Sequence, residues 1–267
     1  MWKWGIVSAV ALCAPALFFM EGALPQATPP AGIGVDRRVL DDLVYANRIL
    51  YDQGVLDGFG HVSVRNPANP DHFLLSRSLA PALVTAGDIL EFDRDGAPLN
   101  AGNRGVYLER FIHAAIYRMR PDVQAVVHSH SPSLIPFGVT GTSLRPVYHM
   151  SAFLGAGAPI FDIRNAAGMT DMLISDNRLA DALARALGKN PVIVRRGHGA
   201  VMACSSIQQA VFRAVYTEMN AKLQSEALQL GKVTYLAPEE AAKAAAAVDG
   251  QVARAWDLWK GRIGKVE

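Results

Sequence analysis

Cysteine is scarce in this sequence, and neither sign of charge is in clear excess. Cys13 and Cys204 are the two cysteines among 267 residues, too few for a disulfide framework or a thiolate zinc site. Lysine and arginine total 26 against 24 aspartates and glutamates, so the chain lacks the basic excess typical of nucleic-acid-binding proteins. We therefore expect no nucleic acid partner, and we expect any metal to be held by imidazole and carboxylate groups.

The sequence also lacks an apolar run of membrane-spanning length. Near the N-terminus, Lys3 precedes about 16 apolar or small residues, a pattern that is typical of a secretory signal. A membrane-spanning helix needs about 20 such residues. Pro25, Pro29 and Pro30 then exclude a helix. Residues 1–31 are predicted to be a signal peptide, or an N-terminal hydrophobic anchor, with a Pro-rich spacer. We expect an exported, periplasmic protein; an uncleaved segment would anchor it to the membrane, and a misassigned start would leave it cytoplasmic.

The rest of the composition is that of a folded domain. Apolar residues make up 51% of the chain and charged residues 19%, which argues against extensive disorder. Helical periodicity of apolar residues predicts helices, and alternation or short apolar runs predict strands. The predicted helices cover residues 35–55, 107–119, 131–138, 176–187, 206–230 and 238–260. The predicted strands cover residues 58–66, 72–76, 89–93, 123–128, 158–163, 191–195 and 201–203.

This order of elements predicts an α/β fold, a three-layer α/β/α sandwich around a mixed, mostly antiparallel sheet. Helices and strands do not alternate regularly, which disfavours a parallel βαβ protein. Residues 32–232 form the predicted main domain, and residues 233–267 a C-terminal helical tail. In the helix over residues 107–119 we expect Leu108 and Phe111 on the buried side.

Three histidines and one glutamate form the pattern that carries chemistry. His128 and His130 are two residues apart at the end of the strand over 123–128, so both imidazoles are expected on one face. His198 lies between two glycines after a second buried strand, and Glu109 lies on the helix before the first. Imidazole suits zinc, iron and manganese sites. The four residues are therefore candidate ligands of one divalent metal, with room left for a substrate.

At these residues the sequence resembles the class II aldolase and adducin family, which includes sugar-phosphate aldolases and epimerases. The resemblance spans residues 36–230. Its marks are Gly60-His-Val-Ser-Val-Arg65, Thr85-Ala-Gly-Asp-Ile89, Glu109-Arg-Phe-Ile-His-Ala-Ala-Ile-Tyr117, Val126-Val-His-Ser-His130 and Arg196-Gly-His-Gly199. The resemblance implies an α/β/α sandwich around a mostly antiparallel sheet. It also implies a homotetramer with active sites at subunit interfaces.

The resemblance further implies roles for the candidate ligands. His128, His130 and His198 would hold one divalent ion, with zinc first and manganese or iron as alternatives. Glu109 would coordinate the metal, or would act as acid and base once substrate displaces it. The 32–232 segment would then be the catalytic domain.

Two departures from the sugar-phosphate members change the expected substrate. Those members carry Ser-Gly-Asn where this chain has Phe59-Gly-His61, and their second phosphate loop is here Leu75-Ser-Arg-Ser-Leu-Ala-Pro81. Arg77 in that loop offers a planar fork suited to a carboxylate, or it pairs with a surface carboxylate. The loop resembles that of the branch that decarboxylates hydroxylated aromatic or pyridine dicarboxylates. We therefore expect a small carboxylated substrate. The candidate substrate-binding residues are Ser76, Arg77, His61, His149 and Tyr216.

The predicted function is that of a metal-dependent carbon–carbon lyase acting through a metal-stabilised enolate. A decarboxylase of a hydroxylated aromatic or heteroaromatic carboxylate is the first reading. Three alternatives stay open: an aldolase or epimerase of a small hydroxy-carbonyl or sugar substrate, a non-heme iron oxygenase, and a non-catalytic adducin-like interaction module. The complete set of four metal-shell residues disfavours the last, because an interaction module has no need of it.

Overall fold

Short apolar strands build a single sheet in the part of the chain that the computed structural model describes, residue 1 and residues 34–266. The predicted N-terminal signal lies outside these residues. The seven strands are β1 His61–Arg65, β2 Phe73–Ser76, β3 Ile89–Phe92, β4 Ala125–Ser129, β5 Ile160–Phe161, β6 Val192–Arg195 and β7 Gly199–Cys204. Their order across the sheet is β3-β2-β1-β4-β7-β6-β5. Every neighbouring pair is antiparallel except β5 and β6, which are parallel. The mixed, mostly antiparallel sheet is therefore confirmed.

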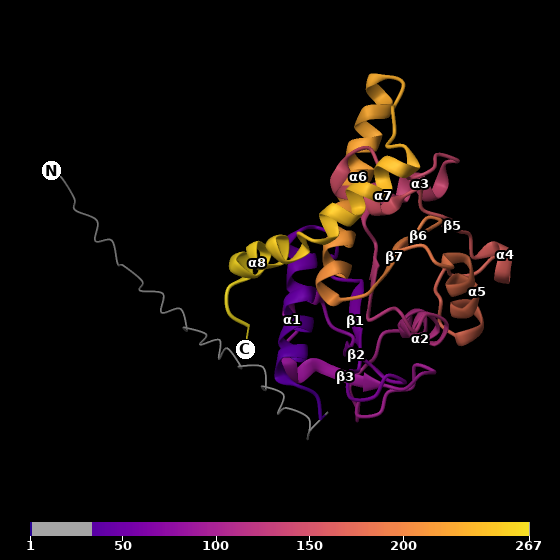
Figure 1. Cartoon of the computed structure of the whole chain (residues 1–267). Coiled ribbons are helices and arrows are strands. Elements are labelled where there is room, and N and C mark those ends of the chain that lie inside the picture. Colours follow the sequence, from indigo (N-terminus) through magenta and orange to yellow (C-terminus); the bar gives the residue numbers. More distant parts are fainter. Residues whose placement is uncertain (2–33, 267) are drawn as a thin grey trace.

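Helices cover both faces of the sheet. The α-helices are α1 Arg37–Asp52, α2 Arg110–Met119, α3 Ile135–Val139, α4 Arg164–Ala167, α5 Asn177–Leu187, α6 Ile207–Leu230, α7 Pro238–Asp249 and α8 Val252–Ile263. Short 3₁₀ turns are η1 Pro81–Leu83, η2 Ala86–Asp88, η3 Pro132–Leu134 and η4 His149–Leu154. Helices α1, α6 and α8 pack together on one side, α2 and α5 pack together on the other, and the end of α6 extends beyond the sheet (Figure 1).

Alternation along the strands assigns each side chain to one of two cores. In β4, Ala125 and Val127 join the core under α1 and α6, whereas Val126 joins the core under α2 and α5. Successive residues of a strand point to opposite faces, so His128 falls on the α2 and α5 side. The imidazole of His128 on the central strand β4 therefore faces α2, the helix that begins just after Glu109.

Three details differ from the sequence-based expectations. Helix α2 begins at Arg110, so Leu108 precedes it and is 60% exposed, and its predicted burial is wrong. The helix predicted over 238–260 is two helices, because Gly250 interrupts it. The strand predicted over 158–163 is shorter in the structure, because β5 covers Ile160–Phe161 and α4 begins at Arg164.

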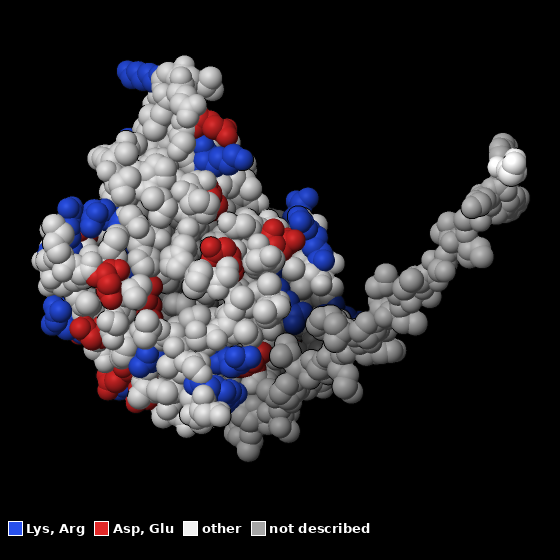
Figure 2. Space-filling model, turned by 180° about the vertical axis from the view of Figure 1, so that it is seen from behind, with Lys and Arg blue, Asp and Glu red and all other residues white. Residues whose placement is uncertain are grey.

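The C-terminal helices are joined to the main core. Helix α8 packs against α1 and α6, and its Trp256 and Trp259 are buried in the core on that side of the sheet. Within residues 34–266, no helix has both the length and the hydropathy that a bilayer span requires. On the face shown in Figure 2, basic and acidic residues are interspersed, without a patch of one sign.

Candidate active site

The end of β4 delivers the first two imidazoles. His128 is fully buried in the strand and His130 follows its last residue, with ring centroids 5.1 Å apart. Nδ1 of His128 lies 3.1 Å from the carbonyl oxygen of Ala200 on β7. A carbonyl only accepts hydrogen bonds, so Nδ1 carries the proton and the Nε2 lone pair of the neutral ring points away from β7.

The tight turn between β6 and β7 delivers the third imidazole. Nε2 of His198 lies 3.1 Å from Nε2 of His130. Gly199 follows with a φ of +145°, and a Cβ at that position would overlap the carbonyl oxygen of Ser129 on β4. Glycine is therefore required where β7 approaches β4 beside His198.

Glu109, the residue immediately before α2, completes the cluster. Its Oε2 atom lies 3.1 Å from Nε2 of His128 and 3.1 Å from Nε2 of His198. Its Oε1 atom accepts a hydrogen bond of 2.9 Å from the backbone N–H of Ile174. Burial alone would raise the pKa of the Glu109 carboxyl, but contacts with His128, His198 and the Arg195 guanidinium hold it well below the usual range. The carboxylate is therefore ionised at neutral pH.

These four side chains fit a divalent metal. One ligand atom from each of Glu109, His128, His130 and His198 can be chosen so that all lie within 4.8 Å of one another. Burial lowers the pKa of His128 to about 4, so its ring is neutral and its Nε2 lone pair faces a carboxylate oxygen. Two electron-rich atoms 3.1 Å apart need a proton or a cation between them, and three imidazoles with one carboxylate match the ligands of zinc-type ions. The predicted ligand set is thus brought together.

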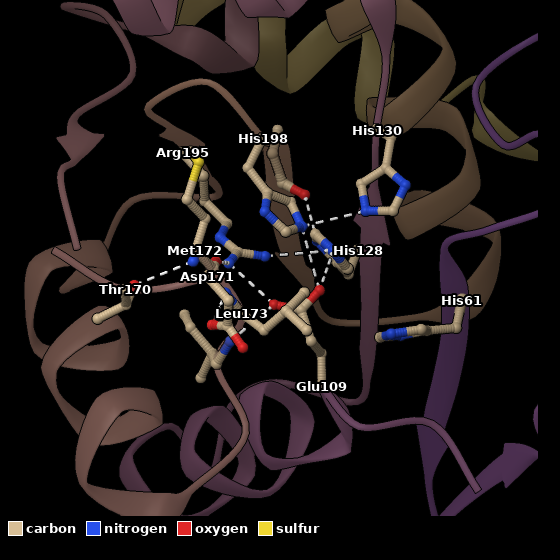
Figure 3. Close-up of polar contacts among 12 residues, drawn as sticks. His61, Glu109, His128, His130, Thr170, Asp171, Met172, Leu173, Arg195 and His198 are labelled. Atoms are coloured by element: carbon tan, nitrogen blue, oxygen red, sulfur yellow. Dashed lines mark hydrogen bonds and ion pairs between the residues drawn. The ribbon is translucent and has the colours of Figure 1, made fainter. Parts of the chain in front are cut away.

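Arg195 contacts this cluster, and the sequence analysis did not predict it. It ends β6 and is 2% exposed, and its Nη2 lies 2.9 Å from Oε1 of Glu109. Its Nη1 lies 3.2 Å from Nε2 of His128 (Figure 3). The signal that could have found it is a charged residue at the end of the buried run Val192–Val194, because a fully buried arginine needs a partner.

His61 lies beside the cluster at the start of β1. It pairs in register with His128, and the two ring centroids are 5.1 Å apart. Its Nδ1 lies 2.7 Å from Nε2 of His113, whose Nδ1 lies 2.6 Å from Oγ of Ser63. That hydroxyl lies 2.8 Å from the Tyr117 hydroxyl. Burial lowers the pKa of His113 to about 3, so this chain of hydrogen bonds links neutral groups.

The direction of the chain follows from its far end. If Tyr117 donates to Ser63 and Ser63 donates to His113, then His113 donates to His61, which keeps its own proton on Nε2. In the reverse direction the Tyr117 proton would need another acceptor, and residues 34–266 offer it no other side-chain hydrogen bond. His61 therefore presents an N–H donor without a hydrogen-bonding partner among these residues.

The loop after β2 reaches the same region through Tyr107. Oγ of Ser76 lies 3.3 Å from the Tyr107 hydroxyl, and the Tyr107 ring lies 4.5 Å from the His61 ring between centroids. Nε of Arg77 donates to Oδ1 of Asp88 at 2.6 Å. Arg77 thus pairs with a carboxylate, as one of the two readings predicted, but Asp88 is buried and is not the surface carboxylate expected. The two Nη groups of Arg77 have no hydrogen-bonding partner among the described residues.

The two remaining candidates lie apart from the four-residue cluster. His149 is exposed at the start of η4, and its ring lies edge-on to that of Tyr148, with centroids 6.2 Å apart. Tyr216 on α6 packs against Phe212, with ring centroids 4.4 Å apart, and near Trp259. Among the described residues, neither makes a hydrogen bond or a ring contact with the cluster. Their predicted role in substrate binding stays a prediction.

Comparisons with known proteins agree with this geometry. A family model described as Class II Aldolase and Adducin N-terminal domain matches residues 41–225. The chain is 38% identical over 235 residues to "Decarboxylase tropJ" of Talaromyces stipitatus, which covers 79% of this chain and 88% of that protein. It is 34% identical over 207 residues to a 3,4-dihydroxyphthalate decarboxylase of Arthrobacter keyseri, over 71% of this chain and 78% of that protein.

A solved structure shows the same fold. An aldolase II superfamily protein from Pseudomonas syringae superposes with a TM-score of 0.71 at 23% identity. The superposition covers 85% of this chain and 92% of the other.

Proposed function

This chain belongs to the class II aldolase and adducin family and is a carbon–carbon lyase, and we propose that it removes carbon dioxide from a hydroxylated aromatic carboxylate. The observation that carries the proposal is the convergence of Glu109 with His128, His130 and His198. The two relatives named above, both decarboxylases by name, support the reaction, and the name of the second supports a dihydroxylated aromatic acid as substrate class. Zinc is the proposed metal, with manganese or iron as the alternatives.

Each group of the cluster has a distinct task in this reaction. A divalent cation held by the three imidazoles would act as a Lewis acid and stabilise negative charge on the substrate. Glu109, being ionised, accepts the proton of the ring hydroxyl. Glu109 then passes this proton to the ring carbon that bears the carboxylate, and that carbon becomes tetrahedral while the neighbouring hydroxyl oxygen becomes a carbonyl. The bond from the ring carbon to the carboxyl carbon breaks, carbon dioxide leaves, and the electron pair moves through the ring to the oxygen, which gives an enolate. A solvent proton restores the hydroxyl. His61 Nε2 donates a hydrogen bond to a substrate oxygen.

The function is tested with a matched pair of substrate panels. Metal-reconstituted protein is incubated with dihydroxylated benzoates and phthalates, and in parallel with phosphorylated sugars and aldehydes. We expect carbon dioxide release from the first panel at a rate proportional to enzyme, and no aldol cleavage or epimerisation in the second. Efficient conversion of a phosphorylated sugar, without decarboxylation of any aromatic acid, would replace the proposal with the aldolase or epimerase alternative.

Arg77 is the proposed anchor for a carboxylate that the substrate retains. Asp88 holds Nε, which leaves both Nη groups for a ligand, and the side chain is 34% exposed. Because solvent screens such a group, we expect Arg77→Ala to lower kcat/KM by about tenfold to a hundredfold, less than for a fully buried pair. Arg77→Lys should fall between that variant and the wild type, because ammonium is a point charge without the planar fork. Bound metal should not change in either, and unchanged kcat/KM in Arg77→Ala would remove the residue from the site.

The proposed assembly is a homotetramer with active sites at subunit interfaces. Helix α6 supports it, because the second half of the helix carries exposed apolar side chains: Met219, Leu223, Leu228 and Leu230. A second copy covering this surface would also bring other chains near Tyr216. We expect light scattering to give four chains per particle, and a monomer at micromolar concentration would contradict the assembly.

Export of the protein is proposed from the N-terminal sequence pattern. We expect protein recovered from its native host to lie in the periplasmic fraction and to lack the first 20-odd residues. Intact-mass measurement decides this, since loss of the signal removes Cys13 and both Trp2 and Trp4. A soluble cytosolic product whose mass includes Met1 to Gly22 would overturn the signal-peptide interpretation.

A further inference from the structure

A buried arginine contacts two of the four residues that would hold the metal. Nη2 of Arg195 donates to Oε1 of Glu109 at 2.9 Å and to the carbonyl of Met172 at 2.9 Å, while Nη1 lies 3.2 Å from Nε2 of His128. Figure 3 shows the guanidinium between the loop of residues 170–173 and the imidazoles. A permanent positive charge among the ligands of a cation is unexpected, because like charges in a buried site repel strongly.

The local backbone holds the guanidinium in this place. Met172 has a φ of +69°, the one left-handed non-glycine residue found in the described chain. Such a conformation is unfavourable for a side chain other than glycine, and here it belongs to the residue whose carbonyl accepts from Arg195. Two residues further on, the N–H of Ile174 donates to the same Oε1 atom that Arg195 contacts. One oxygen of Glu109 is therefore fixed by two donors.

The guanidinium and a metal ion would compete for the same atoms. The lone pair on Nε2 of His128 can accept from Arg195 or bind a metal, but it cannot do both. With Oε1 of Glu109 engaged, a metal can reach the carboxylate through Oε2 alone. Arg195 also withdraws negative charge from Glu109, which weakens the attraction of that carboxylate for a cation.

We infer that Arg195 is a positioning residue that weakens the coordination of the metal by Glu109, so that substrate oxygens can replace this carboxylate. The inference rests on the metal centre of the proposed function and adds a residue that controls it. The three imidazoles would remain the firm ligands. Glu109, held at Oε1 and free at Oε2, would be the ligand that yields and then handles the proton. Removal of Arg195 should therefore tighten metal binding and impair the exchange for substrate.

The test measures Zn²⁺ affinity without substrate. Full-length protein is stripped of metal and titrated with Zn²⁺ against a chromophoric chelator, for the wild type, Arg195→Met and Arg195→Lys. We expect Arg195→Met to bind Zn²⁺ at least about tenfold more tightly. The variant lacks the two Nη groups that contact Glu109 and His128, and it lacks the positive charge that repels the ion. Arg195→Lys keeps the charge and should stay within about threefold of the wild type. Arg196→Met is the matched control, since Arg196 is the next residue but its Nε pairs with Asp162 at 2.9 Å.

A double variant separates positioning from simple charge repulsion. In Arg195→Met with Glu109→Gln, no carboxylate remains to be released, so the affinity gain should disappear relative to Glu109→Gln alone. A gain that persists would mean that Arg195 merely repels the cation, and would overturn the positioning role. The double variant removes a buried charge together with its partner. It therefore also avoids the unfolding risk of leaving Glu109 unpaired in Arg195→Met.

A second readout concerns substrate. In Arg195→Met we expect the KM of the decarboxylated acid to rise more than kcat falls, because a tighter Glu109 ligand is harder to displace. Equal or weaker Zn²⁺ affinity in Arg195→Met would refute the inference while leaving the metal centre and the lyase function intact. Failure of the wild type itself to bind a divalent metal would refute the metal centre on which both proposals stand.

Discussion

Replacing His128 with alanine is expected to strip the protein of its metal and to abolish decarboxylation. His128 is fully buried, and its neutral ring is fixed by the carbonyl of Ala200, so that Nε2 faces Glu109. Loss of this preoriented imidazole leaves two histidines, of which His130 lies beyond the end of β4. Elemental analysis of dialysed protein should give less than about one tenth of the wild-type metal content, and carbon dioxide release should fall to background.

Two further variants keep this result specific. His128→Gln fills most of the space of the ring, so a folded protein that still lacks metal would exclude a packing defect as the cause. His72→Ala is the matched control, because His72 is a half-buried histidine whose Nδ1 pairs with Glu91 at 2.8 Å, outside the cluster. It should keep full metal content and rate. Full metal occupancy in folded His128→Ala would contradict the assignment of the centre.

The sheet and the candidate ligand set were predictable because they follow from local pattern. Alternation along β4 assigns His128 to the face that carries α2, and antiparallel pairing then sets His61 of β1 opposite it. The glycines around His198 predict a tight turn, and at Gly199 no other residue fits, because a Cβ there would overlap the carbonyl oxygen of Ser129. Each of these inferences needs only the period of a strand or the backbone freedom of glycine.

Contacts between distant segments were not predictable from such patterns. Arg195 reads as a strand residue followed by a second arginine, and only the fold shows that it meets Glu109 rather than solvent. The chain of hydrogen bonds from His61 through His113 to Tyr117 joins β1 to α2, and the spacing of residues in the sequence does not show that these two elements meet there. The predicted burial of Leu108 was wrong for a related reason, because apolar spacing does not show that α2 begins only at Arg110.

Replacing Glu109 with glutamine is expected to retain the fold and to slow decarboxylation at least about a hundredfold, the lower end of what a positioned acid or base contributes. The amide fits the site: its oxygen can accept from Ile174 and from Arg195, as Oε1 does. Its NH₂ group would then face Nε2 of His128 and His198, where Oε2 now lies. Shape and hydrogen bonds are thus kept, while the ability to take up a proton is lost.

Stability and rate should respond differently to this change. The substitution leaves the buried Arg195 without its countercharge, so Tm should fall, because one partner of a buried ion pair has been removed. Single-turnover measurement below the Tm of the variant isolates the rate of the chemical step. Glu91→Gln serves as the control for loss of a carboxylate elsewhere, since Glu91 is partly exposed and pairs with His72. A Glu109→Gln rate within about threefold of wild type would show that another group transfers the proton. His61, whose ring lies 5.1 Å from the His128 ring between centroids, would then be the residue to test.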